Sequence, residues 1–190
     1  MAKAAEGKEE KHSPHISAEI HSGELVEPKN DGHQSGKLQV VEFLLGKEHY
    51  AIDLFDVREV VEYTSITKLP NTPTYMKGII DLRGEITTII DLKERLHIPH
   101  DPGSSDDSGR FIVLDEKLTG AKTGILVDDV LAVSTFEKSD VDTASTTGAS
   151  DDAAILGIIK KRAKDKENNV YELVIWIDIR ETLRNMEKQV

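Results

Sequence analysis

Cysteine is absent from the sequence, which excludes a disulfide framework and a thiolate metal site. Basic residues are in the minority, because 24 Lys and Arg face 35 Asp and Glu and give a net charge of -11. This charge disfavours nucleic acid or an anionic membrane surface as the main partner. The longest apolar runs fall far short of the roughly 18 residues of a spanning helix, and the start of the chain lacks the apolar core of a signal peptide. We therefore expect a cytoplasmic protein without direct membrane insertion.

Motifs for bond chemistry are also missing. The sequence has no phosphate-binding glycine loop, dinucleotide fingerprint, zinc-binding helix motif or nucleophile elbow. The remaining candidates for an enzyme are Asp128 with Asp129, and the loop at residues 97–101 with His97, His100 and Asp101. Both are better explained by the polarity of turns and loops. We expect no catalytic residue, no metal and no cofactor, and a small metal-dependent enzyme is the distant alternative.

The composition changes near Lys37. Residues 1–37 are rich in Glu, Lys, His, Ser and Gly and show no sustained apolar period, which predicts a disordered N-terminal arm. Residues 38–190 are long enough for one domain or two small lobes. This part predicts a single folded domain of two repeated lobes.

Short strands dominate the pattern after residue 38, which indicates a mainly β fold built from small barrels. Val41, Phe43 and Leu45 alternate along the first predicted strand and so share one face. The last predicted strand covers residues 170–179. Its expected continuous apolar face consists of Tyr171, Leu173, Ile175, Ile177 and Ile179.

The folded part repeats itself. Three segments recur in the same order with a period of about 73 residues or more, and the insertions fall in polar loops. The matching pairs are residues 51–60 with 124–133, 78–80 with 157–159, and 90–94 with 177–181. A duplicated small barrel is the simplest explanation.

Asp91 and Asp178 occupy equivalent places in the repeat, each with a Glu three residues later. They could be read as paired catalytic carboxylates. Each one also ends a predicted strand and precedes a short helical segment, which is typical of a capping box. Because a cap explains both copies, we interpret Asp91 and Asp178 as structural helix caps.

Residues 69–92 predict two apolar strands joined by a tight Arg83-Gly84 turn. The Asn-Thr-Pro start, Gly78, the Leu-Arg-Gly triplet and the closing Ile-Asp-Leu resemble the hallmark segment of the CheW-like coupling proteins of bacterial and archaeal chemotaxis. The resemblance extends over roughly residues 38–183. It implies two intertwined five-stranded SH3-like β-barrels with short helices and a shared apolar seam.

The resemblance implies a non-catalytic adaptor. Such a protein couples the cytoplasmic tip of a methyl-accepting chemoreceptor to the regulatory domain of a CheA-type histidine kinase, and it transmits receptor state to kinase activity. It would be cytoplasmic and recruited to membrane receptor arrays. The nearer alternative is a CheW-like scaffold of another kinase pathway, such as motility or development.

Five residues match family positions associated with the receptor groove: Val57, Glu59, Gly78, Arg83 and Gly84. Each has a structural alternative. Val57 fits a protein core equally well, Glu59 a solvated acid, Gly78 a strand bulge, and Arg83 an exposed neighbour of the turn glycine. The resemblance assigns no residue to the kinase surface.

Overall fold

The computed structural model describes residues 36–100, 108–143, 154–162 and 171–187, with side chains up to residue 184. All of them belong to one compact unit, Gly32–Val190. The predicted arm lies outside the described residues except for its last two, and Lys37 already begins the first strand. Asp101 of the candidate metal loop also lies outside them.

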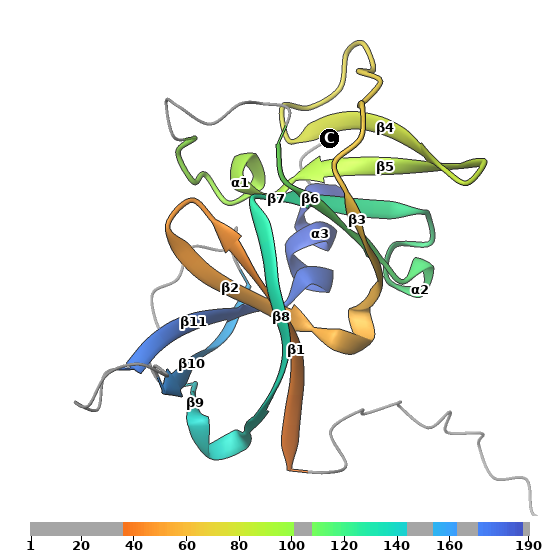
Figure 1. Ribbon diagram of the computed structural model, residues 1–190. Helices are drawn as coiled ribbons and strands as arrows, with labels where there is room; N and C mark the ends of the chain where they lie inside the picture. Colours follow the sequence, from red (N-terminus) through yellow and green to blue (C-terminus); the bar gives the residue numbers. More distant parts are fainter. Residues whose placement is uncertain (1–35, 101–107, 144–153, 163–170, 188–190) are drawn as a thin grey trace, which may run out of the picture. The chain divides into compact units, whose positions relative to one another are not determined.

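Six strands form the first sheet, in the order β8-β1-β2-β11-β10-β9 (Figure 1). Their bounds are Lys37–Leu45 for β1, Glu48–Asp53 for β2, Asp129–Glu137 for β8, Val141–Asp142 for β9, Ile155–Arg162 for β10 and Tyr171–Ile177 for β11. Neighbouring strands are antiparallel except β2 and β11, which are parallel. The parallel pair joins strands from opposite ends of the chain.

Five strands form the second sheet, in the order β3-β6-β7-β5-β4. Their bounds are Val57–Glu62 for β3, Met76–Leu82 for β4, Glu85–Asp91 for β5, Arg110–Leu114 for β6 and Thr123–Val127 for β7. Here β5 and β7 are the parallel pair. The two sheets therefore share one strand pattern, in which β8, β1, β2, β11 and β10 correspond to β3, β6, β7, β5 and β4.

Each sheet combines strands from both repeats of the sequence. The first repeat runs from β1 to β5 and the second from β6 to β11, yet β1 pairs with β8 and β3 pairs with β6. This exchange confirms the predicted intertwined, mainly β architecture. The first sheet has one more strand than predicted, the two-residue β9, whose counterpart in the second sheet is an isolated bridge between Thr67 and Ile79.

Three apolar clusters fill the fold. The largest lies between the sheets and contains Val41, Phe43 and Leu45 of β1 together with residues of β6, β7, β11 and the C-terminal helix. A smaller cluster on the other face of the first sheet includes Leu38 and Val40. The third belongs to the second sheet alone. Strand β1 is thus buried on both faces, and the shared cluster is the predicted apolar seam.

The last strand differs from its prediction. It ends at Ile177, and Ile179 begins the helix α3, Ile179–Glu187. Ile177 and Ile179 are buried, whereas the side chains of Tyr171 and Leu173 are exposed. The predicted continuous apolar face is therefore wrong at its N-terminal end, because the shared core reaches only the last part of the strand.

Short helices follow equivalent strands in the two repeats. The carboxylate of Asp91 accepts hydrogen bonds from the amides of Lys93 and Glu94 at 3.1 and 3.3 Å, at the start of α1, Leu92–Arg95. Asp178 accepts from the amide of Glu181 at 3.0 Å, next to α3. The capping box is not completed, because the amides of Asp91 and Asp178 donate to the carbonyls of Tyr75 and Ala154 instead of to a Glu side chain.

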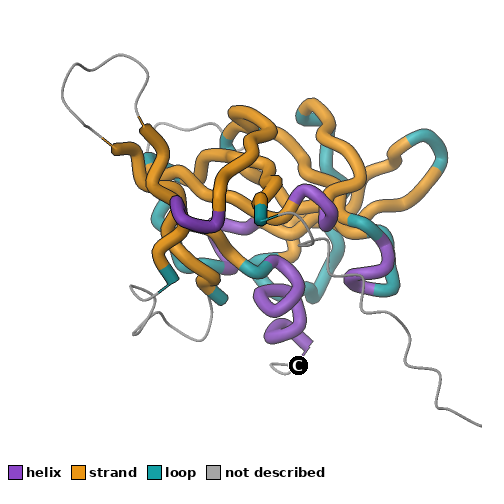
Figure 2. Tube along the Cα trace, turned by 90° about the horizontal axis from the view of Figure 1, so that it is seen from below, coloured by secondary structure: helices purple, strands orange, loops and turns teal. Residues whose placement is uncertain are grey.

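The remaining helical segments are short, namely η1 at Leu54–Asp56, α2 at Glu116–Thr119 and η2 at Lys138–Asp140. Figure 2 shows them among the strands, with the longer α3 near the C-terminus. In the part of the chain that the structure describes, no helix is long and apolar enough to cross a membrane.

Candidate functional site

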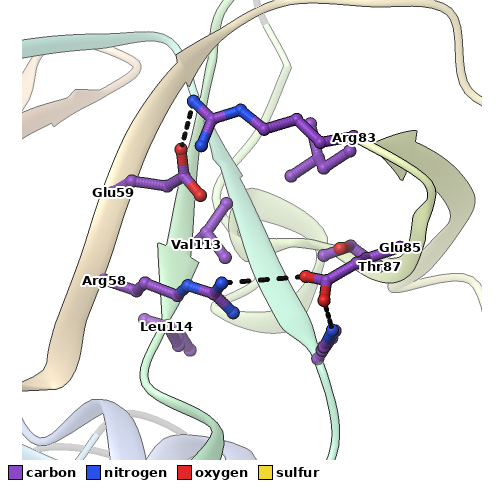
Figure 3. A pocket seen from close by; sticks show the side chains of 9 residues that line it. Arg58, Glu59, Arg83, Glu85, Thr87, Val113 and Leu114 are labelled. Atoms are coloured by element: carbon purple, nitrogen blue, oxygen red, sulfur yellow. Dashed lines mark ion pairs between the residues drawn. The ribbon is translucent and has the colours of Figure 1, made fainter.

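A pocket opens on the second sheet, beside the hairpin of β4 and β5 (Figure 3). It lies where β3 faces that hairpin, with β6 beneath. Its lining consists of Arg58, Glu59, Leu82, Arg83, Glu85, Thr87, Val113, Leu114 and Lys122. Two of the residues expected at a binding groove, Glu59 and Arg83, are thus brought together.

The Arg83-Gly84 turn has the geometry of a two-residue hairpin. Leu82 pairs directly with Glu85, and the two residues between them have positive φ values of 56° and 83°. Positive φ at both central positions defines a type I′ turn, which favours Asn-Gly. Arg83 is an uncommon residue for its left-handed conformation. The turn leaves its side chain 83% exposed at the edge of the pocket.

A bulge in β3 brings two consecutive side chains to the pocket. Val57 pairs with Leu114 and Glu59 pairs with Val113, so Arg58 is the extra residue on this strand. Side chains of a regular strand alternate between its faces, and the bulge interrupts this alternation. Arg58 and Glu59 therefore both line the pocket.

Two ion pairs connect β3 with the β4–β5 hairpin, as Figure 3 shows. Arg83 Nη2 lies 3.3 Å from Glu59 Oε2, and Arg58 Nη2 lies 3.7 Å from Glu85 Oε2. The polarity of the two pairs is opposite, because β3 contributes the acid in one and the base in the other. Val113 lies between them in the view of Figure 3.

The floor of the pocket is almost closed to solvent. Thr87, Val113 and Leu114 are 2%, 4% and 1% exposed. The floor therefore combines two apolar side chains with Thr87 and offers little open surface. A partner can contact mainly the charged rim and the partly exposed Leu82.

The charges at the Arg58 end form a closed ring of four residues. Arg58 Nη1 lies 3.0 Å from Glu116 Oε1, Lys122 Nζ lies 3.7 Å from the same carboxylate, and Lys122 also contacts Glu85. The hydrogen bond from Lys122 lowers the pKa of Glu85, and the charges of Lys122 and Arg58 lower it further. Lys122 and Arg58 thus favour the charged form of Glu85.

The other three residues expected at the groove lie outside the lining of the pocket, namely Gly84 in the turn, Val57 and Gly78. Val57 is partly buried and packs against the shared core. Gly78 is buried at a register shift of β4, where its φ is 146° and an added Cβ would lie 2.3 Å from the carbonyl oxygen of Thr67. The structure thus gives Val57 and Gly78 roles in the fold and Gly84 a role in the turn, and a contact with a partner remains a prediction for all three.

Seven of the nine lining residues were not identified from the sequence, including Arg58, Val113 and Lys122. Arg58 adjoins two expected residues, but a strand pattern assigns it to the opposite face from Glu59 unless the bulge is known. Val113 and Lys122 come from the second repeat. Only the exchange of strands between repeats brings them to this site.

The candidate catalytic and metal residues have structural partners. Asp128 accepts hydrogen bonds at 2.6 Å from both the amide of Gly46 and Lys93 Nζ, and Asp129 Oδ1 lies 3.1 Å from Arg110 Nε. The ring of His100 lies 2.9 Å from Glu94 Oε1. Among the described residues, no group of three or more His, Asp and Glu is placed to hold a metal ion.

Comparison with known proteins gives one consistent result. A family model described as a CheW-like domain matches residues 39–187. The chain is 32% identical over 148 residues to the chemotaxis protein CheW of Klebsiella aerogenes, a match that covers 76% of this chain and 81% of that protein. The chain belongs to the CheW-like family. This confirms the resemblance read from residues 69–92.

Further CheW-like proteins are similar over different lengths. The chain is 36% identical to the chemotaxis protein CheW of Treponema pallidum over 107 residues, which are 55% of this chain and 62% of that protein. It thus spans less than two thirds of that relative. The crystal structure of the scaffolding protein TtCheW from Thermoanaerobacter tengcongensis matches with a TM-score of 0.61 and 34% identity, covering 75% of this chain and 89% of that one. The family is one of non-catalytic scaffold and adaptor proteins.

Proposed function

We propose that this protein is a chemotaxis adaptor that couples the cytoplasmic tips of chemoreceptors to the regulatory domain of a CheA-type histidine kinase. Its membership of the CheW-like family supports the proposal. The observation on which the receptor side depends is the pocket, where Arg83 and Glu59 meet above an apolar floor. In this role the protein is cytoplasmic and is recruited to membrane receptor arrays through its partners.

The receptor tip docks at the pocket in this proposal. Apolar side chains of the tip contact the partly exposed Leu82, and Arg83 donates hydrogen bonds to carbonyl or carboxylate groups at the edge. A guanidinium suits this task because it offers several directed donors on a long, partly apolar stem. Glu59 occupies only part of this donor capacity, at 3.3 Å.

The protein transmits receptor state without bond chemistry. It holds receptor and kinase in one geometry, and it biases kinase activity if its contacts differ between receptor states. Such coupling needs two separate surfaces. The pocket serves as the receptor surface, and the regulatory domain of the kinase binds another surface of this protein.

Arg83→Glu is expected to abolish receptor binding and to leave the melting temperature nearly unchanged. The substitution places a second carboxylate next to Glu59 at the edge of the pocket, whereas the exposed ion pair that it removes contributes at most about 1 kcal/mol to stability. Calorimetry with a soluble receptor cytoplasmic fragment measures the affinity, and thermal unfolding measures the stability.

Arg83→Asn is the matched variant, because Asn is favoured at this position of a type I′ turn. It removes the guanidinium while preserving the hairpin, and we expect weaker receptor binding at equal or higher stability. Both variants should bind the isolated kinase regulatory domain like the original protein. A large loss of stability in Arg83→Asn would show that Arg83 is structural.

If the original protein binds no chemotaxis kinase domain, the alternative function is favoured, namely a scaffold of another kinase pathway.

A further inference from the structure

Three cations line the pocket, and they differ in their exposure and in the number of carboxylates that they contact. Arg58 and Lys122 each contact two carboxylates, those of Glu85 and Glu116. Arg83 contacts Glu59, and its side chain is 83% exposed, compared with 45% for Arg58 and 28% for Lys122. Both ends of the pocket thus have as many acids as bases, and Arg83 is the most accessible of the three cations.

We propose that the ring of Arg58, Glu85, Lys122 and Glu116 determines the specificity of the pocket. The ring holds Arg58 and Lys122 with two carboxylates each, whereas Arg83 has one carboxylate partner and a mostly exposed side chain, so that Arg83 recognises an acceptor group on the docked segment. The fitting ligand is a helical segment with an apolar side chain against Leu82 and one carbonyl or carboxylate group at the Arg83 end. This inference rests on the proposed function, because it names the chemistry that the same pocket accepts.

Stability alone is a weak explanation for the ring. All four side chains are between 28% and 47% exposed, and exposed ion pairs contribute little to folding. Without the two carboxylates, Glu59 alone would face Arg58, Lys122 and Arg83, and the positive pocket would attract acidic segments of many kinds. Specificity is a difference of affinities, and masking a charge lowers the affinity for the wrong partners.

Two sets of variants change the charge of the ring in opposite directions. Glu85→Gln with Glu116→Gln exposes two cations, whereas Arg58→Gln exposes carboxylates. The probes are a receptor cytoplasmic fragment and a synthetic decoy helix with leucine on one face and glutamate on the other. Glu62→Gln is the matched control, because Glu62 lies on β3 with an 81% exposed side chain and pairs with Arg110 outside the pocket.

We expect the double Gln variant to bind the decoy about tenfold more tightly than the original protein, with a steeper salt dependence. Arg58→Gln should bind the decoy more weakly, and Glu62→Gln should bind it like the original protein. A purely structural ring would instead weaken receptor binding in both ring variants, in parallel with their melting temperatures, and that result would overturn the inference. Unchanged decoy affinity in both would also overturn it.

Glu116→Gln alone provides the same test if the double variant fails to fold, because Glu116 is outside the lining of the pocket. The decoy separates this inference from the proposed function. If the original protein does not bind the receptor fragment, the proposed function is rejected. The decoy affinities of the variants would still test the role of the ring. If receptor binding depends on Arg83 but decoy binding does not change with the charge of the ring, the specificity role of the ring is rejected and the proposed function stands.

Discussion

Gly78 and Gly84 lie in the same hairpin, but they tolerate a side chain differently. A Cβ on Gly78 would lie 2.3 Å from the oxygen of Thr67, whose amide and carbonyl pair with Ile79. A Cβ on Gly84 meets nothing within 4 Å, although its φ of 83° is also positive. Backbone conformation alone thus opposes a side chain at Gly84, and both conformation and contact oppose it at Gly78.

Gly78→Ala is therefore expected to lower the free energy of unfolding by about 3 kcal/mol or more. Gly84→Ala is the control within the hairpin, and it should lose only about 1 kcal/mol, the cost of a left-handed alanine. Urea unfolding of the two variants measures the difference. Equal losses would mean that the approach of Thr67 relaxes easily and that the bulge does not need glycine.

At the residue scale, the sequence predicted the turn but not the full pocket. Arg83 and Gly84 stand between two apolar runs, so local chemistry indicated a tight hairpin. Glu59 was expected from the family pattern. Arg58 was not, because a bulge reverses the face of a strand residue without a clear sequence signal.

Among the elements, two ion pairs connect the repeats at related places. Arg180, the second residue of α3, contacts buried Asp56 of η1 with Nε at 2.9 Å and Nη2 at 2.5 Å. Lys93, the second residue of α1, contacts Asp128 at 2.6 Å. In the first pair, a cation of α3 in the second repeat contacts an acid that follows β2 in the first repeat. In the second pair, a cation of α1 in the first repeat contacts an acid that follows β7 in the second repeat.

Asp56→Asn is expected to change how stability depends on pH. Burial raises the pKa of Asp56 above its ordinary value of 3.8, and the hydrogen bond and charge of Arg180 oppose this shift. The folded protein thus holds this proton more tightly than the unfolded chain. The stabilisation is fully present below the unfolded pKa and is lost as pH rises through the folded pKa.

The stability of the original protein relative to Asp56→Asn should therefore increase as pH falls from neutral toward 4. At neutral pH the substitution should cost little, because Arg180, 54% exposed, remains solvated. Urea unfolding of both proteins over this pH range measures the difference. A relative stability that falls with decreasing pH would show that the ion pair with Arg180 outweighs burial.

Element types were predictable from the sequence, whereas their edges were not. The apolar alternation of β1 gave its core face correctly, since Val41, Phe43 and Leu45 are all buried. The same reasoning failed for Tyr171 and Leu173, which are exposed although they continue the pattern of β11. Alternation reports which residues share a face, but the extent of the neighbouring element decides how much of that face is covered.

For the whole molecule, the repeat in the sequence predicted the duplicated fold, and the exchange of strands followed only from the family resemblance. The two sheets are not equivalent at the site. By strand correspondence, Glu42 of β1 takes the place that Val113 has in β6. Glu42 is fully buried and its Oε2 lies 2.7 Å from Lys161 Nζ. An apolar floor in the second sheet thus corresponds to an ion pair in the first.

We propose that this protein connects receptor to kinase through the Arg83 pocket. The most direct test measures autophosphorylation of a CheA-type kinase reconstituted with receptor fragments assembled on vesicles. The original protein and the Glu62→Gln control should bring kinase activity under receptor control. Arg83→Glu and Arg83→Asn should bind the kinase yet leave its activity at the level without receptor. Full receptor control with a stably folded Arg83→Glu variant would show that the receptor does not dock at the Arg83 pocket.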